Sequence, residues 1–152
     1  MFLRGVMKNK PFYIFEVALL FWEGKAARTL QIETGKPLSK FAEAIVKAFG
    51  FSLDHAFGFY SDFENSGINS ENIYELFSEM KEGPIRPHHK GVKKVKIKEA
   101  FKVPGDRMLF RFGYIESRFF SVELKEIKEG RNQGMKTAVI GSSGQPPALN
   151  EF

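Results

Sequence analysis

The sequence predicts one α+β domain, in which a mixed, mainly antiparallel sheet of about five to six strands packs against two helices. Between residues 37 and 50, apolar residues recur at the three-and-four spacing of an amphipathic helix. Elsewhere they alternate with polar residues, as they do on half-buried strands. The composition, 43% hydrophobic and 27% charged, is typical of a globular domain.

The chain of 152 residues has the length of one domain. We expect residues 1–10 to be a loose lead-in and residues 11–128 to form the domain. Residues 129–152 are polar and glycine-rich, and we expect them to form a tail that packs in part on the domain. The 17 phenylalanines predict a core that is rich in aromatic rings.

The chain contains no cysteine, which excludes disulfides, thiol nucleophiles and cysteine-ligated metal sites. This absence fits a cytoplasmic protein, and no cofactor is expected. The apolar run from Phe12 to Trp22 contains Glu16 and is too short to cross a bilayer. We therefore expect no membrane partner.

The same run, Phe12 to Trp22, predicts a central strand, because it is almost continuously apolar and rich in residues that favour strands. Residues 28–33 alternate, and Gly24 lies in a turn between the two segments, so we expect an antiparallel hairpin. Tyr13 to Phe21 place every second residue on one apolar face. Glu16 lies on the other face, where solvent or a neighbouring Lys or Arg is expected to satisfy it.

The segment from Pro37 to Ser61 predicts a helix followed by an aromatic strand. Pro37 suits a first helical turn, and Gly50 suits a left-handed position just after the last one. Phe57 and Phe59 share one face of the strand. The predicted buried face of the helix consists of Leu38, Phe41, Ile45, Ala48 and Phe49.

The remaining elements follow from the same periodicities. Asn69 or Ser70 can cap a second helix, which Gly83-Pro84 ends. Residues 92–98 alternate as a strand, and residues 107–112 and 118–124 predict a second hairpin. The predicted apolar faces consist of Ile73, Leu76, Phe77 and Met80 in the helix, Val95 and Ile97 in the lysine-rich strand, and Met108, Phe110, Phe112, Phe120, Val122 and Leu124 in the hairpin.

The net charge of +5 is concentrated in one segment, which has no acidic residue between Gly83 and Lys98. Alternating lysines on a strand lie about 7 Å apart, close to the spacing of successive phosphates. The segment therefore predicts nucleic-acid binding; the alternative is an edge strand that lysines keep soluble. The predicted nucleic-acid-binding residues are Arg86, Lys90, Lys93, Lys94, Lys96 and Lys98.

Asp54 and His55 form the pair with the strongest catalytic character, because a carboxylate beside an imidazole can support general base chemistry. Glu116 is a further candidate for the same site. The alternative is structural, with Asp54 bonding to backbone amides at a corner. His88 and His89 are interpreted as surface loop residues, and no metal site is expected.

The order of these motifs resembles the plasmid pRiA4b ORF-3-like family, whose members are also labelled insertion-element passenger or resolvase-like proteins. The match includes Gly50, Phe51, His55, Phe57 and Phe59, and it extends over roughly residues 11 to 150. The resemblance implies an α+β domain with a mixed sheet and an association with a mobile element. It implies no activity, because the family is functionally obscure.

The hairpin motif of that family is degenerate in this chain. Residues 113–118 read GYIESR where relatives carry an acidic, aromatic turn, and only Glu116 keeps an acid. Phe120 stands where relatives have a histidine, and Gln145 stands where they often have a cysteine. If these positions form a site in relatives, the resemblance implies that it is lost or reshaped here.

The function predicted from the sequence is a non-catalytic binding module with nucleic acid as its first partner. One alternative is a metal-dependent or acid/base hydrolytic enzyme centred on Asp54 and His55. Another is a protein–protein adaptor or self-associating scaffold that uses exposed phenylalanines.

Overall fold

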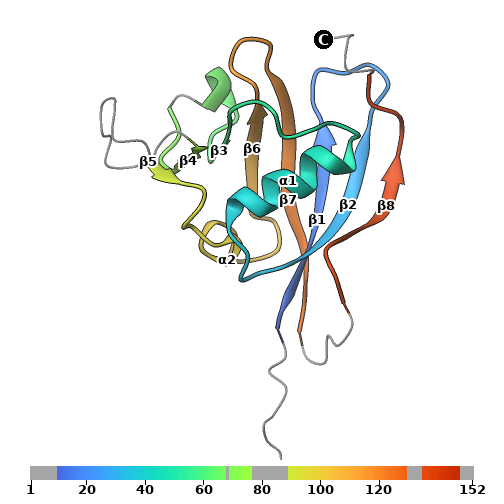
Figure 1. Cartoon of the computed structure of the whole chain (residues 1–152), viewed down its shortest axis with the longest axis vertical. Coiled ribbons are helices and arrows are strands. Elements are labelled where there is room, and N and C mark those ends of the chain that lie inside the picture. Colours follow the sequence, from blue (N-terminus) through green and yellow to red (C-terminus); the bar gives the residue numbers. More distant parts are fainter. Residues whose placement is uncertain (1–9, 68, 77–88, 130–134, 148–152) are drawn as a thin grey trace, which may run out of the picture.

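A sheet with one long helix across it organises the computed structural model, which describes residues 10–67, 69–76, 89–129 and 135–147 (Figure 1). The elements in chain order are β1 (Phe12–Leu19), β2 (Ala27–Glu33), α1 (Leu38–Ala48), β3 (Phe57–Tyr60), a 3-10 turn (Glu64–Gly67), β4 (Ile73–Glu75), β5 (His89–Gly91), α2 (Ile97–Ala100), β6 (Arg107–Phe112), β7 (Arg118–Lys128) and β8 (Ala138–Ser143). No described helix is long and apolar enough to cross a membrane.

The sheet has eight strands in the order β5-β4-β3-β6-β7-β1-β2-β8. Strands β4 and β5 run parallel and the other neighbours run antiparallel, which confirms the mixed, mainly antiparallel sheet. The predicted count of five to six strands is wrong. The prediction missed β4 and β5, which have only 3 residues each, too few for alternation to be recognised, and β8, which lies in the segment predicted to be a polar tail.

Both predicted hairpins are present. Strands β1 and β2 pair with Glu16 opposite Thr29, and β6 and β7 pair with Phe110 opposite Phe120. Strand β1 ends earlier than predicted, so Phe21 is not part of its apolar face. Phe21 instead has a left-handed backbone (φ 58°) and is 90% exposed. Glu16 is exposed, and Glu123 rather than a basic residue lies beside it on β7.

The predicted first helix is confirmed as α1, with Pro37 extended before it and Gly50 left-handed after it (φ 83°). No side chain caps its first turn. The backbone amide of Leu38 donates to the carbonyl of Val95 at 2.9 Å, and that of Ser39 donates to the carbonyl of Val92 at 3.0 Å. A segment distant in sequence therefore satisfies amides that a helix start leaves unpaired.

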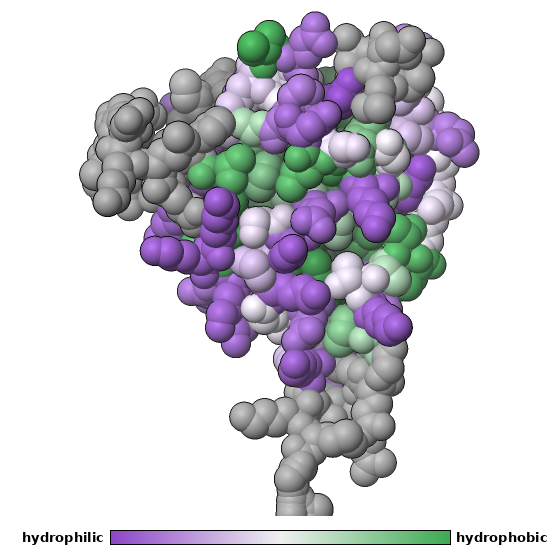
Figure 2. Space-filling view, in the orientation of Figure 1, coloured by the Kyte–Doolittle hydropathy of each residue, from purple (hydrophilic) through white to green (hydrophobic). Residues whose placement is uncertain are grey.

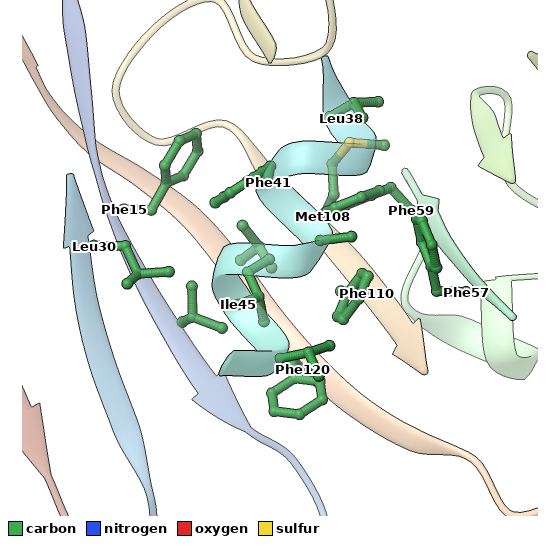
Figure 3. Close-up of a cluster of buried hydrophobic side chains, with 14 of the residues drawn as sticks. Phe15, Leu30, Leu38, Phe41, Ile45, Phe57, Phe59, Met108, Phe110 and Phe120 are labelled. Carbon is green, nitrogen blue, oxygen red and sulfur yellow. The ribbon is translucent and has the colours of Figure 1, made fainter. Parts of the chain in front are cut away.

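The core lies between α1 and one face of the sheet, which we call the covered face (Figures 1 and 3). The ring of Phe41 lies 4.4 Å from that of Phe15 on β1 and 5.7 Å from that of Phe59 on β3, between ring centroids. Phe110 lies 4.8 Å from Phe59 and continues the cluster across β6. The long helix is held by aromatic packing against several strands at once.

The predicted second helix is wrong where the structure describes it. Residues 73–75 form β4, with Tyr74 opposite Phe59 and Ile73 opposite Tyr60 on β3. Of the predicted apolar face, Leu76 packs in part against the core, whereas Ile73 lies on the opposite face of the sheet and Tyr74, its neighbour, is in the core. Phe77 and Met80 lie outside the described residues. The second helix of the structure is the single turn α2, which lies further along the chain.

The predicted lysine-rich strand is also wrong. Residues 92–95 form turns and a bend, and residues 97–100 form α2. Val92 and Ile97 are fully buried, but they are not at strand spacing. The backbone of this segment bonds to the loop before α1, because the amides of Ile97 and Lys98 donate to the carbonyls of Lys36 and Thr34. These bonds bring the lysines to the start of α1.

Residues 138–147 join the domain through β8 and through Arg28, a buried arginine on β2. The Arg28 guanidinium donates to the carbonyls of Ser143, at the end of β8, and of Gly144 just after it, and to that of Ala48 at the end of α1. The indole of Trp22 donates to the carbonyl of Gln145 at 3.0 Å. Arg28 thus links the last turn of α1 to the far edge of the sheet.

Candidate functional site

The described basic residues predicted to bind nucleic acid gather at one end of α1. All of them are exposed, and Lys36 and Lys40 from the start of α1 lie on the same side of the molecule. We call this group the lysine surface; its members are Lys36, Lys40, Lys90, Lys93, Lys94, Lys96 and Lys98. Figure 2 shows hydrophilic side chains over this part of the molecule. Arg86 lies outside the described residues.

Few carboxylates compete for these charges. The Glu99 carboxylate accepts the backbone amide of Lys96 at 2.6 Å, and Glu43 lies 3.8 Å from the Lys40 ammonium in an exposed pair. The first amides of α1 bond to Val92 and Val95, so the helix start offers them to no ligand. An anion here would meet flexible lysine side chains, without the regular 7 Å row that a strand would have supplied.

Asp54 and His55 line an open groove of about 430 Å³ between α1 and the start of β3. The groove also contains Ser39, Glu43 and Lys93, so it adjoins the lysine surface. His55 Nε2 lies 3.6 Å from Asp54 Oδ1, and the two side chains are 59% and 66% exposed. The pair is therefore present, but it is solvated and loosely held.

Glu116, the third catalytic candidate, lies exposed in the β6–β7 hairpin and does not line that groove. Burial lowers the pKa of the Arg118 guanidinium, and the nearby Glu116 and Asp54 carboxylates oppose this change. The Arg118 guanidinium also stacks over the ring of Phe51 at 4.8 Å. Asp54 and Glu116 thus share an arginine as their common electrostatic neighbour.

Histidine and carboxylate side chains gather nowhere in the described ranges in a group of three or more that could hold a metal ion. His88 lies outside the described residues. The backbone of His89 belongs to β5, but its side chain is likewise outside the description. The predicted place in a loop is wrong for His89, which begins β5, and the expectation that the two histidines bind no metal stays a prediction.

The structure reveals a polar cluster that the sequence analysis missed, on the open face of the sheet, opposite α1. The hydroxyls of Tyr60 and Tyr114 donate to the same oxygen, Glu75 Oε2, at 2.7 and 3.1 Å. The two phenol oxygens lie 3.0 Å apart. The Arg111 guanidinium stacks over Tyr114 at 4.7 Å and donates to Ser117 Oγ at 2.8 Å. We call these residues the tyrosine cluster.

Two glycines make room for Tyr60 in this cluster. A Cβ at Gly58 would lie 2.6 Å from the Tyr60 hydroxyl, and a Cβ at left-handed Gly67 would lie 2.5 Å from the Tyr60 Cβ. Burial is the largest of the effects that raise the pKa of both phenols, which keeps them protonated as hydrogen-bond donors. Gly58, inside the aromatic strand β3, was the one feature of the local sequence that could have indicated this cluster.

Comparisons with known proteins agree with this architecture. A protein of unknown function from Methanosarcina mazei Go1 has a similar crystal structure, with a TM-score of 0.73 and 13% sequence identity over 93% of this chain and 75% of that one. At that identity the likeness concerns the fold alone. No curated protein gives a significant match. The family model described as plasmid pRiA4b ORF-3-like protein matches residues 11–148. This chain therefore belongs to the plasmid pRiA4b ORF-3-like family.

Proposed function

We propose that the protein is a non-catalytic binding module that contacts the phosphate backbone of nucleic acid through the lysine surface. The observation that supports the proposal is the grouping of exposed lysines from two distant segments at the start of α1. The few acids nearby are engaged with an amide or a lysine. An association with a mobile genetic element, which the family resemblance implies, belongs to the same proposal.

Binding of this kind draws its free energy from counterion release, because each lysine that neutralises a phosphate displaces a condensed cation. The ammonium groups lie on flexible side chains and do not form a rigid set of donors that could recognise base edges. Affinity should therefore depend strongly on salt and weakly on base sequence.

The direct test is a gel-shift salt series with a mixed-sequence duplex and the triple variant Lys94→Gln/Lys96→Gln/Lys98→Gln. We expect the slope of log affinity against log salt to become shallower by up to about 3 units, since each lost duplex phosphate contact removes about 0.9. The melting temperature should change little, because these side chains are exposed.

A matched control removes the same charge elsewhere, in Lys125→Gln/Lys128→Gln/Lys136→Gln, whose lysines are also exposed. This variant should retain most of the salt slope. Equal losses in the two variants would show that net charge alone drives binding. Failure of the wild type to shift duplex or single strands at about 50 mM salt would refute the proposal.

A second candidate function is acid/base hydrolysis in the groove of Asp54 and His55. The observation that favours it is that Ser39 and Lys93 line the same groove. An imidazole beside a carboxylate can serve as a general base when its pKa lies near the working pH. The test is hydrolysis of p-nitrophenyl acetate over a pH series by wild type and His55→Ala. A rate above that of free imidazole, with a titration lost in His55→Ala, would favour this function.

A further inference from the structure

Strand β8 ends the sheet with a backbone edge that no described strand occupies. It pairs with β2 on one side only. Its six residues, AVIGSS, include no charge and no proline, and Val139 and Ile140 are 45% and 51% exposed. Natural edge strands are usually guarded by lysine, proline, short length or cover. Here the feature that protects the edge from pairing with other chains is a bulge at Ile140, which has no partner in β2.

A groove of about 570 Å³ lies beside this edge, between α1 and strands β2 and β8. Its apolar lining comes from Leu30, Ile32, Ala44, Ala48 and Val139. Its basic lining comes from Lys36, Lys40 and Lys47, and Glu43 is the acidic residue in it. In Figure 2, hydrophobic atoms gather on the side where Figure 1 places β8, next to hydrophilic side chains over α1.

The lysines that line the groove indicate which kind of partner the β8 edge binds. Pairing of two β8 edges would bring the lysine-lined grooves of two copies toward each other, and like charges oppose that contact. The bulge also interrupts the flat edge that a continuous sheet between two copies would need. A short strand with acidic side chains meets neither objection, because lysines attract carboxylates and a few residues can pair on one side of a bulge.

We infer that β8 and the adjoining groove bind an extended, acidic segment of a partner protein by strand addition. The backbone of the segment pairs with the free edge of β8. Alternate side chains then project over the face that carries α1, where carboxylates meet Lys47, Lys40 and Lys36 and an apolar side chain contacts Val139. Main-chain bonds supply affinity, and the lysines select acidic sequences.

The experiment selects peptides of about 12 residues from a random phage-displayed library on the purified chain. We expect enriched sequences with acidic residues at alternate positions. A fluorescein-labelled copy of the best peptide should bind in a polarisation assay. N-methylation of its alternate amides should abolish binding, since strand addition needs those donors. Failure to enrich acidic peptides, or binding that survives N-methylation in both registers, would overturn the inference.

Two charge reversals locate the site. Lys47→Glu, in the groove, should weaken the peptide by at least about tenfold, whereas Lys94→Glu, on the lysine surface, should change affinity by less than about twofold. Both side chains are exposed, and neither has a hydrogen bond or ion pair within the described residues. Equal losses would indicate general polyanion binding and overturn the inference. Displacement of the peptide by a single-stranded oligonucleotide at equal concentration would assign the groove to nucleic acid instead.

This inference does not depend on the proposed nucleic-acid function. Peptide binding that is sensitive to Lys47→Glu can hold in a protein that shifts no duplex. A gel shift that is sensitive to the lysine-surface triple variant can likewise hold without any acidic peptide. The two outcomes are therefore measured separately.

Discussion

The two faces of the sheet are built on different principles. On the covered face, α1 seals a nearly all-apolar core in which Phe41, Phe59 and Phe110 are fully buried. On the open face, a small apolar group of Tyr60, Ile73 and Leu109 adjoins the tyrosine cluster, where hydroxyls, a carboxylate and a guanidinium meet. The contrast indicates that stability comes mainly from the covered face, whereas directional hydrogen bonds define the open face.

The largest expected effect lies on the covered face. Phe41→Ala should lower the free energy of unfolding by about 3–5 kcal/mol, because it removes a fully buried ring and leaves a cavity. Urea denaturation monitored by Trp22 fluorescence measures the loss. If Phe41→Ala lowered the free energy of unfolding no more than the open-face substitutions do, the contrast between the faces would be contradicted.

Gly67→Ala tests how tightly the open face is packed. The backbone at Gly67 is left-handed (φ 80°), and a Cβ would lie 2.5 Å from the Tyr60 Cβ. We expect a loss of about 1–3 kcal/mol in the same denaturation experiment. The matched control is Gly50→Ala, which carries a similar backbone cost (φ 83°) with nothing within 4 Å of the new Cβ. Equal losses would show that contact with Tyr60 adds nothing.

Tyr60→Phe removes one of the two hydroxyls that share Glu75 Oε2. We expect it to cost about 1–2 kcal/mol, because a partly buried carboxylate loses a donor while the ring stays in place. Equilibrium unfolding gives the value. In a double-mutant cycle with Glu75→Gln, the two losses should not be additive. Additive losses would show that the hydroxyl and the carboxylate are not coupled.

The raised pKa values of Tyr60 and Tyr114 predict a stability change at alkaline pH. In the unfolded chain a phenol has its ordinary pKa of 10.0, whereas in the folded state it stays protonated to higher pH. The stabilisation is complete below pH 10 and should decline as the pH rises above it. After allowance for partial solvent exposure, we expect a loss of roughly 1 kcal/mol by about pH 11.

The comparison that isolates this effect is Tyr60→Phe/Tyr114→Phe, which leaves lysine titration unchanged. The difference in unfolding free energy between wild type and the double variant should shrink between about pH 9.5 and 11.5. A constant difference over that range would show that the two phenols ionise alike in both states.

The smallest effect is expected on the outer side of α1. Lys40→Ala and Lys47→Ala should each change the unfolding free energy by less than about 0.5 kcal/mol, since both side chains are exposed and the Lys40–Glu43 pair is solvated. Thermal melts suffice for the comparison. A shift for either lysine as large as that for Phe41→Ala would mean that α1 presents a different face to the core.

Long elements with a regular period could be predicted from the sequence. Strands β1, β2, β6 and β7 and helix α1 each contain enough residues for a repeat to show, and each has at least one buried face. The resemblance to the family depended on residues within and around these elements, and the match over residues 11–148 confirms it. The proximity of Asp54 and His55 could also be predicted, because the two residues are adjacent in the chain.

Only the tertiary structure decided the short strands, the path of the lysine-rich segment and the tyrosine cluster. A strand of 3 residues has no period of its own and exists because a partner supplies its hydrogen bonds. The lysine-rich segment does not form a strand, because its carbonyls accept hydrogen bonds from the first amides of α1. Tyr60, Glu75 and Tyr114 meet across separations of 15, 39 and 54 residues, which only the pairing of strands can close.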